Sequence, residues 1–416
     1  MSKLTNFFLP SESENMHDKA GGVTVQRIAS IDILRGLTMV LMIFVNDFWT
    51  LKGVPYWMEH RKHGVDGIGL SDVVFPAFLF IVGLSLPYAI NNRRSKGDNN
   101  WQLVMHILLR TFALLVMGVF LVNGETYNEA ATGMPGCYYN FLICLSFIFI
   151  WNTYPSTINR YIPLAARIVS FVTLITLSIV YRGGHDDNIQ RFAPQWWGIL
   201  GLIGWAYLAS ALITLFARNR LYIVLTGWIF FCILSIIYKA GIIPHHSVLS
   251  VIPDAILGGT LAGLTMGGVL TSMIFSYFVR RKENGRLTIV LLLFSSLLFG
   301  LSVLTHPYWG LAKLGATPAW LFLSSAITII ALLIIYWVAD VYGKSKWFDI
   351  IKPAGTATIL CYLVPDLVYS LREIFAIQLP DTLLTGGIGL VKSFLFALLC
   401  VLITGLLIRL GIRMKL

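Results

Sequence analysis

The sequence predicts an all-α, polytopic membrane protein with about twelve transmembrane helices and with both termini in the cytoplasm. Hydrophobic residues make up 57% of the 416 residues and charged residues only 12%. That charged fraction is about half of the value for an average soluble domain. Apolar runs of about 20 residues, long enough to cross a bilayer, alternate with short polar loops. The formal net charge of +11 is spread over these loops, as the positive-inside rule describes, which argues against a nucleic-acid partner.

The chain opens with a polar stretch, residues 1–26, that lacks the apolar core and cleavage site of a signal peptide. We therefore expect 1–26 to be a cytoplasmic tail and 27–416 to form a single transmembrane domain embedded in the lipid bilayer. The first two spans, at about 31–49 and 70–90, flank a polar loop and are expected to form the centre of the molecule.

Ten further apolar runs follow, and an even number of spans places both ends of the chain on one side. Lysine and arginine cluster in the loops on that side, for example in 91–99, 217–220 and 280–286, which assigns it to the cytoplasm. The eighth span contains GGTLAGLTMGG, and small residues at this density predict close helix packing. The ten runs lie at about 103–122, 138–152, 162–181, 197–216, 221–238, 255–278, 288–305, 319–340, 354–370 and 387–408.

Polar residues inside the first span indicate a functional site, because such groups are costly at membrane depth. Arg35 and Asn46 are eleven residues apart, which on an ideal helix places them on one face and roughly 16 Å apart, with Asp32 near the same line. Arg35 has two interpretations. It could pair with Asp32 three residues earlier, or it could bind a phosphate group. Arg110, inside the third span, has no local acid and needs a partner from elsewhere in the fold.

His60, in the outer loop, is a candidate general base, because a neutral imidazole accepts protons near physiological pH. Taken alone, it could equally be a solvated loop histidine. Asp72 could orient the imidazole or cap the second span, and Asn46 could bond a helix end or stabilise an oxyanion. Lys313 lies in another outer loop, where a lysine that extends to the membrane surface is the ordinary interpretation. The histidines and cysteines lack metal-ligand spacing, so we expect no metal.

Two long motifs in the first quarter carry a resemblance to a known family. They read RIASIDILRGLTMVLMIFVND and HRKHGVDGIGLSDVVFPAFLFIVGLS, with weaker echoes in DAILGGTLAGLTMGGVL, LAKLGATPAWLF, YWVADV and KPAGTATILCYL. The sequence resembles the transmembrane acyltransferase family of heparan-alpha-glucosaminide N-acetyltransferase, and in particular its bacterial branch. One departure is GCYYN at Gly136–Asn140, where the family has GVLQR.

The resemblance implies transfer of an acetyl group from cytoplasmic acetyl-CoA to an amino sugar on the far side of a bacterial inner membrane. The family's active-site histidine falls on His60, its asparagine on Asn46, and its aspartate on Asp72. Some bacterial members accompany N-acetylglucosamine utilisation, so glucosamine or a small glucosamine-containing sugar is the expected acceptor. The resemblance leaves open a homodimer, and a direct or a ping-pong mechanism.

On this hypothesis Arg35 and Arg110 bind the CoA nucleotide, while Asp47, Asp66 and Lys313 bind the acceptor. The rival interpretation is a transporter of amino sugars that uses the same polar path. Twelve spans with both ends inside are common among transporters, although the sequence shows no convincing repeat of two halves.

Overall fold

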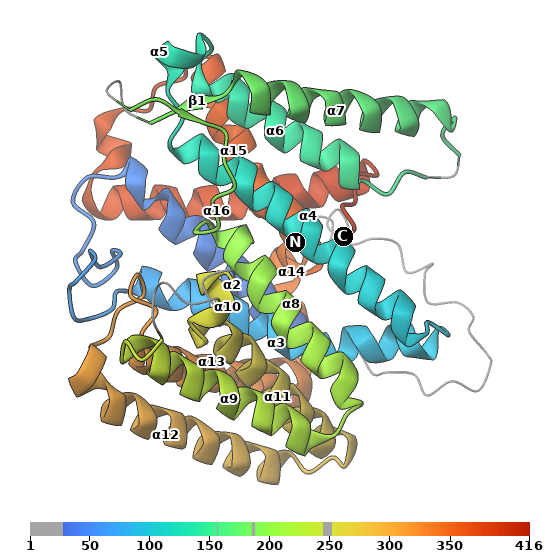
Figure 1. Ribbon diagram of the computed structural model, residues 1–416, viewed down its shortest axis with the longest axis vertical. Helices are drawn as coiled ribbons and strands as arrows, with labels where there is room; N and C mark the ends of the chain where they lie inside the picture. The colour runs from blue at the N-terminus through green and yellow to red at the C-terminus, as the bar shows by residue number, and fades with distance from the viewer. Residues whose placement is uncertain (1–27, 156, 185–187, 244–251) are drawn as a thin grey trace.

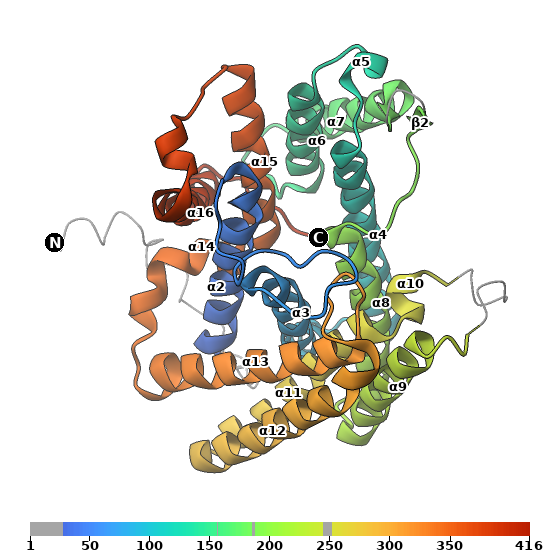
Figure 2. The same ribbon diagram turned by 90° about the vertical axis from the view of Figure 1, so that its left-hand side faces the viewer.

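The computed structural model describes residues 28–155, 157–184, 188–243 and 252–416. The tail expected at 1–26 lies outside these ranges. Within them, ten helices are long and apolar enough to cross a membrane, and they pack into the helical bundle seen in Figures 1 and 2. They are α2 (Ala29–Asn46, continued by the 3-10 turn η2, Asp47–Thr50), α3 (Leu70–Ser95), α4 (Asn100–Glu125), α7 (Tyr161–Val180), α8 (Ile199–Ala217), α9 (Leu221–Lys239), α11 (Thr260–Arg280), α12 (Asn284–Trp309), α13 (Pro318–Tyr336, continued by the π-helical turn η4, Trp337–Val341) and α16 (Gly386–Arg409).

The other two expected spans differ from straight transmembrane helices. The fourth is α6 (Gly136–Trp151), which has only 16 residues. The eleventh is broken, because η5 (Ser345–Ile351) and α14 (Lys352–Thr356) meet α15 (Thr358–Ile374) at an angle of 79°. An all-α polytopic membrane fold is thus confirmed, with ten such helices in the described chain, or eleven when the bent pair counts as one span.

The bend is fixed by a close contact between α14 and α2. A Cβ atom on Gly355 would meet the backbone carbonyl of Asp32, and one on Gly36 would lie 2.8 Å from the carbonyl oxygen of Ile351. Two glycines that face each other let the backbones touch, and this holds the short α14 against the first span. The sequence pattern did not predict this break, because the contact joins residues more than 300 positions apart.

Burial separates central helices from peripheral ones. The most apolar 18-residue windows of α2, α3, α11 and α13 are 61–67% buried, whereas that of α7 is 17% buried. The close packing predicted for the glycine-rich span is confirmed, because a Cβ on Gly268 of α11 would collide with the Phe80 carbonyl of α3 and one on Gly83 would collide with the Thr265 carbonyl. Small residues therefore hold α3 and α11 together in the core.

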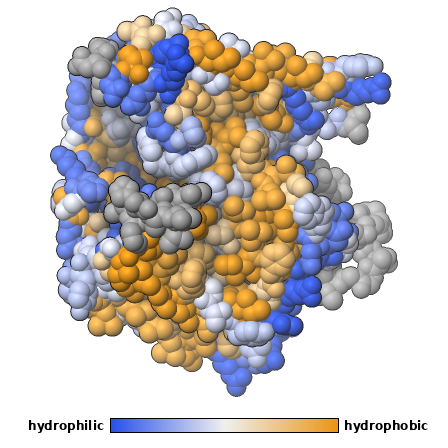
Figure 3. Space-filling model, in the orientation of Figure 1, coloured by the Kyte–Doolittle hydropathy of each residue, from blue (hydrophilic) through white to orange (hydrophobic). Residues whose placement is uncertain are grey.

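The remaining elements are short and connect the spans. They are α5 (Glu129–Thr132), α10 (Asp254–Leu257), η6 (Asp381–Leu384) and the antiparallel pair β1 (Arg182–Gly183) and β2 (Gln190–Arg191), in which Arg182 pairs with Arg191. Figure 3 shows a broad apolar surface across the middle of one face, with hydrophilic residues gathered at its left and right margins, where the helices end. This is the surface expected of a protein that spans a bilayer.

Candidate active site

The loop between η2 and α3, residues 51–69, is the one that the sequence predicts to lie outside, and we call it the outer loop; it places His60 against the first turn of α3. The imidazole Nδ1 lies 2.8 Å from Oδ1 of Asp72, with the Asp72 side chain 1% exposed and that of His60 44% exposed. Asp72 is the third residue of α3, and its carboxylate accepts the backbone N–H of Gly69 just before the helix, as in a capping box. Both interpretations of Asp72 therefore hold together, because the residue caps the helix and contacts His60.

The bonds of Asp72 favour one tautomer of His60. Oδ2 accepts the backbone N–H groups of Arg61 and Gly69 at 3.1 and 3.0 Å, and the Asp72 carbonyl accepts the indole N–H of Trp320 at 2.9 Å. With the carboxylate held in place as an acceptor, we place the imidazole proton on Nδ1, directed at Oδ1. The lone pair of Nε2 is then available to a substrate.

Lys313 reaches the same histidine from the loop between α12 and α13. Its Nζ lies 3.2 Å from Nδ1 of His60, so the lysine contacts the site. Burial lowers the pKa of Lys313 to about 8, while the negative charge of Asp72 acts in the opposite direction. Near neutral pH this amine therefore carries a positive charge beside the imidazole.

Asp66 fastens the His60 loop to the α12–α13 loop. Its carboxylate accepts the backbone N–H of Leu311 at 2.7 Å and lies 3.0 Å from Nε2 of His306, while Gly67 donates to the Leu311 carbonyl. The Leu311 N–H and the His306 ring lower the pKa of Asp66. Figure 2 shows the loop crossing this end of the helices. The Asp66 side chain is still 58% exposed, and its carboxylate has lone pairs left that can accept a sugar hydroxyl.

Asn46 and Asp47 end the first span in different environments. Asn46 is exposed, and among the described residues no side-chain hydrogen bond joins it to His60 or Asp72. Asp47 is 1% exposed and accepts hydrogen bonds from Tyr369, Lys392 and Ser393, each at 2.6 Å. These bonds join η2 to α15 and α16, so the acceptor-binding role expected for Asp47 would compete with a structural one.

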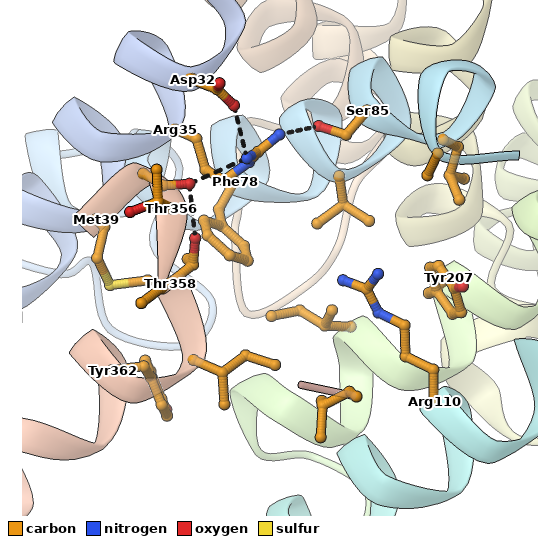
Figure 4. Close-up of a pocket in the computed structure, with 18 of the residues that line it drawn as sticks. Asp32, Arg35, Met39, Phe78, Ser85, Arg110, Tyr207, Thr356, Thr358 and Tyr362 are labelled. Carbon is orange, nitrogen blue, oxygen red and sulfur yellow. Dashed lines mark hydrogen bonds and ion pairs between the residues drawn. The ribbon is translucent and has the colours of Figure 1, made fainter. Parts of the chain in front are cut away.

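A second site opens farther along α2. A cavity of about 690 Å³ lies between α2, α3, α4, α8 and the α14–α15 bend (Figure 4). Arg35 lies on its wall and bonds Asp32 and the Gly355 carbonyl, both at 3.0 Å, and the Ser85 hydroxyl. The pairing of Arg35 with Asp32, one of the two interpretations left open above, is therefore present, and it leaves the guanidinium on the cavity surface.

Arg110 faces Arg35 from the opposite wall. Its guanidinium carbon lies 4.9 Å from the centre of the Tyr207 ring, and its buried Nε has no hydrogen-bond partner among the described residues. In Figure 4 the Arg110 side chain extends from α4 toward the middle of the cavity. The Tyr207 ring is thus one partner of the Arg110 cation. The guanidinium also faces the cavity, where its N–H groups can donate to a ligand.

The cavity follows the polar face of α2 that the spacing predicted. Asp32, Arg35, Met39 and Met42 line it in succession, and Asn46 continues this face one turn later, about 6 Å beyond Met42. The cavity therefore points toward the outer site without including His60 or Asp72 in its lining.

Comparison with known proteins adds a family to this geometry. The sequence profile of a family described as a domain of unknown function (DUF5009) matches residues 27–252, which is more than half of the chain. The chain belongs to this family. The matched region contains the outer loop, α2, α3 and Arg110, so the main parts of both sites lie within it.

Two relatives with a named activity are similar to part of this chain. Heparan-alpha-glucosaminide N-acetyltransferase of Mus musculus is 36% identical over 101 residues, and that of Homo sapiens is 35% identical over 98 residues. These stretches cover 24% and 23% of this chain but only 14% of each relative. The chain therefore matches about a seventh of the length of either relative.

Of the residues that the sequence singled out, the structure brings His60, Asp72 and Lys313 together, and it adds supports that the sequence did not indicate. His306, Tyr369 and Lys392 were not expected near it, although each lies in or beside an apolar run where a polar group is costly. That cost was the available signal. The cost of a polar group in an apolar run implies that the residue has a bonding partner, but it does not identify that partner. Only the fold shows that His306 contacts Asp66 and that Lys392 contacts Asp47.

Proposed function

We propose that the protein is a membrane acyltransferase that transfers the acetyl group of acetyl-CoA to the amine of glucosamine or of a small glucosamine-containing sugar. The observation that carries the proposal is the His60–Asp72 pair at 2.8 Å with Nε2 left available. The two relatives that share part of the sequence are named as N-acetyltransferases of a glucosaminide, which supports this reaction class.

In the proposed chemistry His60 acts as the base. The neutral amine of the sugar attacks the thioester carbonyl, a C–N bond forms, and Nε2 of His60 takes the proton that the nitrogen loses. The tetrahedral intermediate then collapses, the C–S bond breaks, and the thiolate of CoA leaves and takes the proton from the His60 imidazolium, which returns the ring to its neutral form. Asp72 orients the ring through Nδ1, and the exposed Asn46 amide at the end of α2 is the donor we propose for the oxyanion.

The Arg35–Arg110 cavity is proposed to bind the nucleotide end of acetyl-CoA. Two guanidinium groups on opposite walls suit phosphate groups, because planar N–H forks donate to two phosphate oxygens at once. An extended pantetheine arm could follow the face of Met39, Met42 and Asn46 toward the outer loop. With the basic loops in the cytoplasm, this route leads from cytoplasmic acetyl-CoA to a sugar on the periplasmic side of an inner membrane.

The rival function is transport of an amino sugar. One observation favours it, since broken helices, such as the one with the 79° bend between α14 and α15, are common at transporter binding sites. The two functions differ in their product. A transporter delivers glucosamine unchanged and needs no acetyl donor.

Sealed proteoliposomes separate the two functions. Glucosamine is enclosed and acetyl-CoA is added outside, and the enclosed sugar is identified by mass. N-acetylglucosamine inside the vesicles, formed only with acetyl-CoA and not with CoA, is the expected result. If labelled glucosamine instead crosses unmodified without any acetyl donor, the acyltransferase proposal is wrong.

A further inference from the structure

A second recess lies where α6 ends and α7 begins, and it shares Lys415 with the lining of the Arg35–Arg110 cavity. It has a volume of about 540 Å³ and is bounded by the end of α6, the connecting loop, the first turns of α7 and Lys415. Helices α6 and α7 lie side by side in Figure 1, with this connection at their right-hand end. Counting spans along the chain, this is the end that also holds the basic loops 91–99, 217–220 and 280–286.

The charge of the recess is positive throughout. Arg160, Arg167 and Lys415 line it, and no carboxylate side chain does. In the described part of the chain these three cations are engaged only by neutral groups. Arg167 donates to the Asn152 carbonyl and lies over the Tyr154 ring, and Arg160 donates to the Tyr161 hydroxyl. Their charge is therefore not cancelled and remains available to an anion.

A short backbone ladder fixes the position of Lys415. Its N–H donates to the Trp151 carbonyl at 3.0 Å, Thr153 donates to the Arg413 carbonyl at 2.9 Å, and Arg413 donates to the Asn152 side chain at 2.8 Å. Residues 413–415 thus form one wall of the recess, and these bonds hold the backbone of Lys415 there.

The surface beside the recess is apolar and outward-facing. Helix α7 is the least buried of the candidate spans, and Figure 3 shows an apolar surface along it that ends in hydrophilic residues at its right-hand end. Large apolar side chains more than 50% exposed continue along the helix from the recess, namely Ile162, Leu164, Ile168, Val169, Phe171 and Val172. A positively charged recess that continues into an apolar surface is complementary to a molecule with an anionic end and long apolar chains.

We propose that this recess binds the headgroup of an anionic phospholipid, whose acyl chains lie along α7. Basic pockets beside transmembrane helices on the positively charged side of a membrane protein bind such headgroups. Phosphatidylglycerol is the probe. It presents one phosphodiester charge to Arg160, Arg167 and Lys415, and its chains cover side chains that otherwise contact only bulk lipid.

Native mass spectrometry of delipidated, detergent-purified protein tests this proposal. Phosphatidylglycerol should bind at least tenfold more tightly than phosphatidylcholine. The variant Arg160→Gln/Lys415→Gln leaves the Arg167 bond to Asn152 intact, and it should weaken phosphatidylglycerol about fivefold for each charge removed. The matched control Arg281→Gln/Lys346→Gln removes two exposed charges from the same end of the molecule and should leave the affinity unchanged.

Five results would overturn the proposal. Phosphatidylcholine could bind as tightly as phosphatidylglycerol, or both double variants could behave alike. Glycerol 3-phosphate could bind as tightly as the lipid, which would make this a site for a soluble phosphate. Acetyl-CoA could displace the lipid, which would join the recess to the Arg35–Arg110 cavity, since Lys415 lines both. Finally, the protein could form a dimer without any lipid, and that dimer could fail to bind phosphatidylglycerol. The exposed face of α7 would then be covered by a second copy of the chain rather than by lipid.

Discussion

At the scale of single residues, the chemistry depends on which nitrogen of His60 is engaged. Nδ1 is directed at Asp72, so Nε2 is the group that can accept a proton. His60→Ala should lower turnover by roughly 10²–10⁴-fold, because a positioned base contributes that much to the rate. It should cost little stability, since the half-exposed ring leaves no buried cavity. Turnover of purified protein is measured beside a calorimetric titration with acetyl-CoA, whose binding should persist.

The neighbouring His63 is the control for this experiment. It is exposed three residues away, and His63→Ala should be nearly as active as the original protein. Near-normal turnover of His60→Ala would remove His60 from the mechanism. A labelled acetyl group trapped on the protein in the absence of amine would favour a covalent intermediate over direct transfer.

Lys313 should impose a pH dependence on the reaction. Its pKa is about 8, so the amine is charged below that pH and becomes neutral as the pH rises through it. If the ammonium group helps to hold the acceptor, the ratio of kcat/KM between the original protein and Lys313→Met is constant below about pH 7 and falls through about pH 8. The exposed Lys62→Met is the control. A ratio that does not change with pH would exclude this role.

The buried ion pair between Asp47 and Lys392 should matter for stability more than for chemistry. Lys392→Met leaves the carboxylate of Asp47, which is 1% exposed, without its cation, and breaking such a pair costs about 3–5 kcal/mol. Thermal unfolding in detergent measures the loss, and Asp47→Asn added to Lys392→Met should recover most of it. Lys52→Met, which breaks an exposed pair with Asp381, should change little. Equal effects of the two lysine changes would contradict this account.

The residue-scale results show what a single sequence can predict. Residue type and loop position singled out His60, Asp72 and Lys313, and the three side chains lie together in the structure. The Asp32–Arg35 contact follows from helical spacing alone. The partners of Asp47 lie more than 320 positions away, and no local pattern encodes which distant helix supplies them.

At the scale of elements, apolar length predicted where the spans lie but not their shape. The run expected at 354–370 is bent because Gly355 touches α2, and a hydropathy pattern contains no information on that contact. The glycine-rich span was different. There the small residues themselves were the signal, and they pack α11 against α3 as expected.

Two matched glycine substitutions test that packing. Gly83→Ala places a methyl group against the Thr265 carbonyl of α11, so α3 and α11 must separate, and the unfolding temperature should fall clearly. Gly300→Ala, in α12, adds the same methyl where no atom lies within 4 Å. It should be neutral or slightly stabilising, because alanine favours a helix over glycine. Similar unfolding temperatures for the two variants would show that α3 and α11 do not depend on this close approach.

At the scale of the whole molecule, the orientation in the membrane decides which side of it each of the two sites faces. The His60 site lies at one end of the helices, and the basic loops lie at the other, nearer to Arg35. The proposed direction of acetyl transfer depends on which end faces the cytoplasm, and the lysine and arginine bias predicts that the basic end does.

Labelling of introduced cysteines in intact cells tests this orientation. The five native cysteines are all buried, so a membrane-impermeant thiol reagent should leave the original protein unlabelled. His63→Cys should react from outside, because residue 63 is exposed in the outer loop, whereas Lys96→Cys and Arg281→Cys, also exposed, should react only after the membrane is opened. The opposite pattern would place the His60 site in the cytoplasm. Acetyl-CoA and the histidine would then meet on one side, and transfer across the membrane would no longer be needed to explain the two sites.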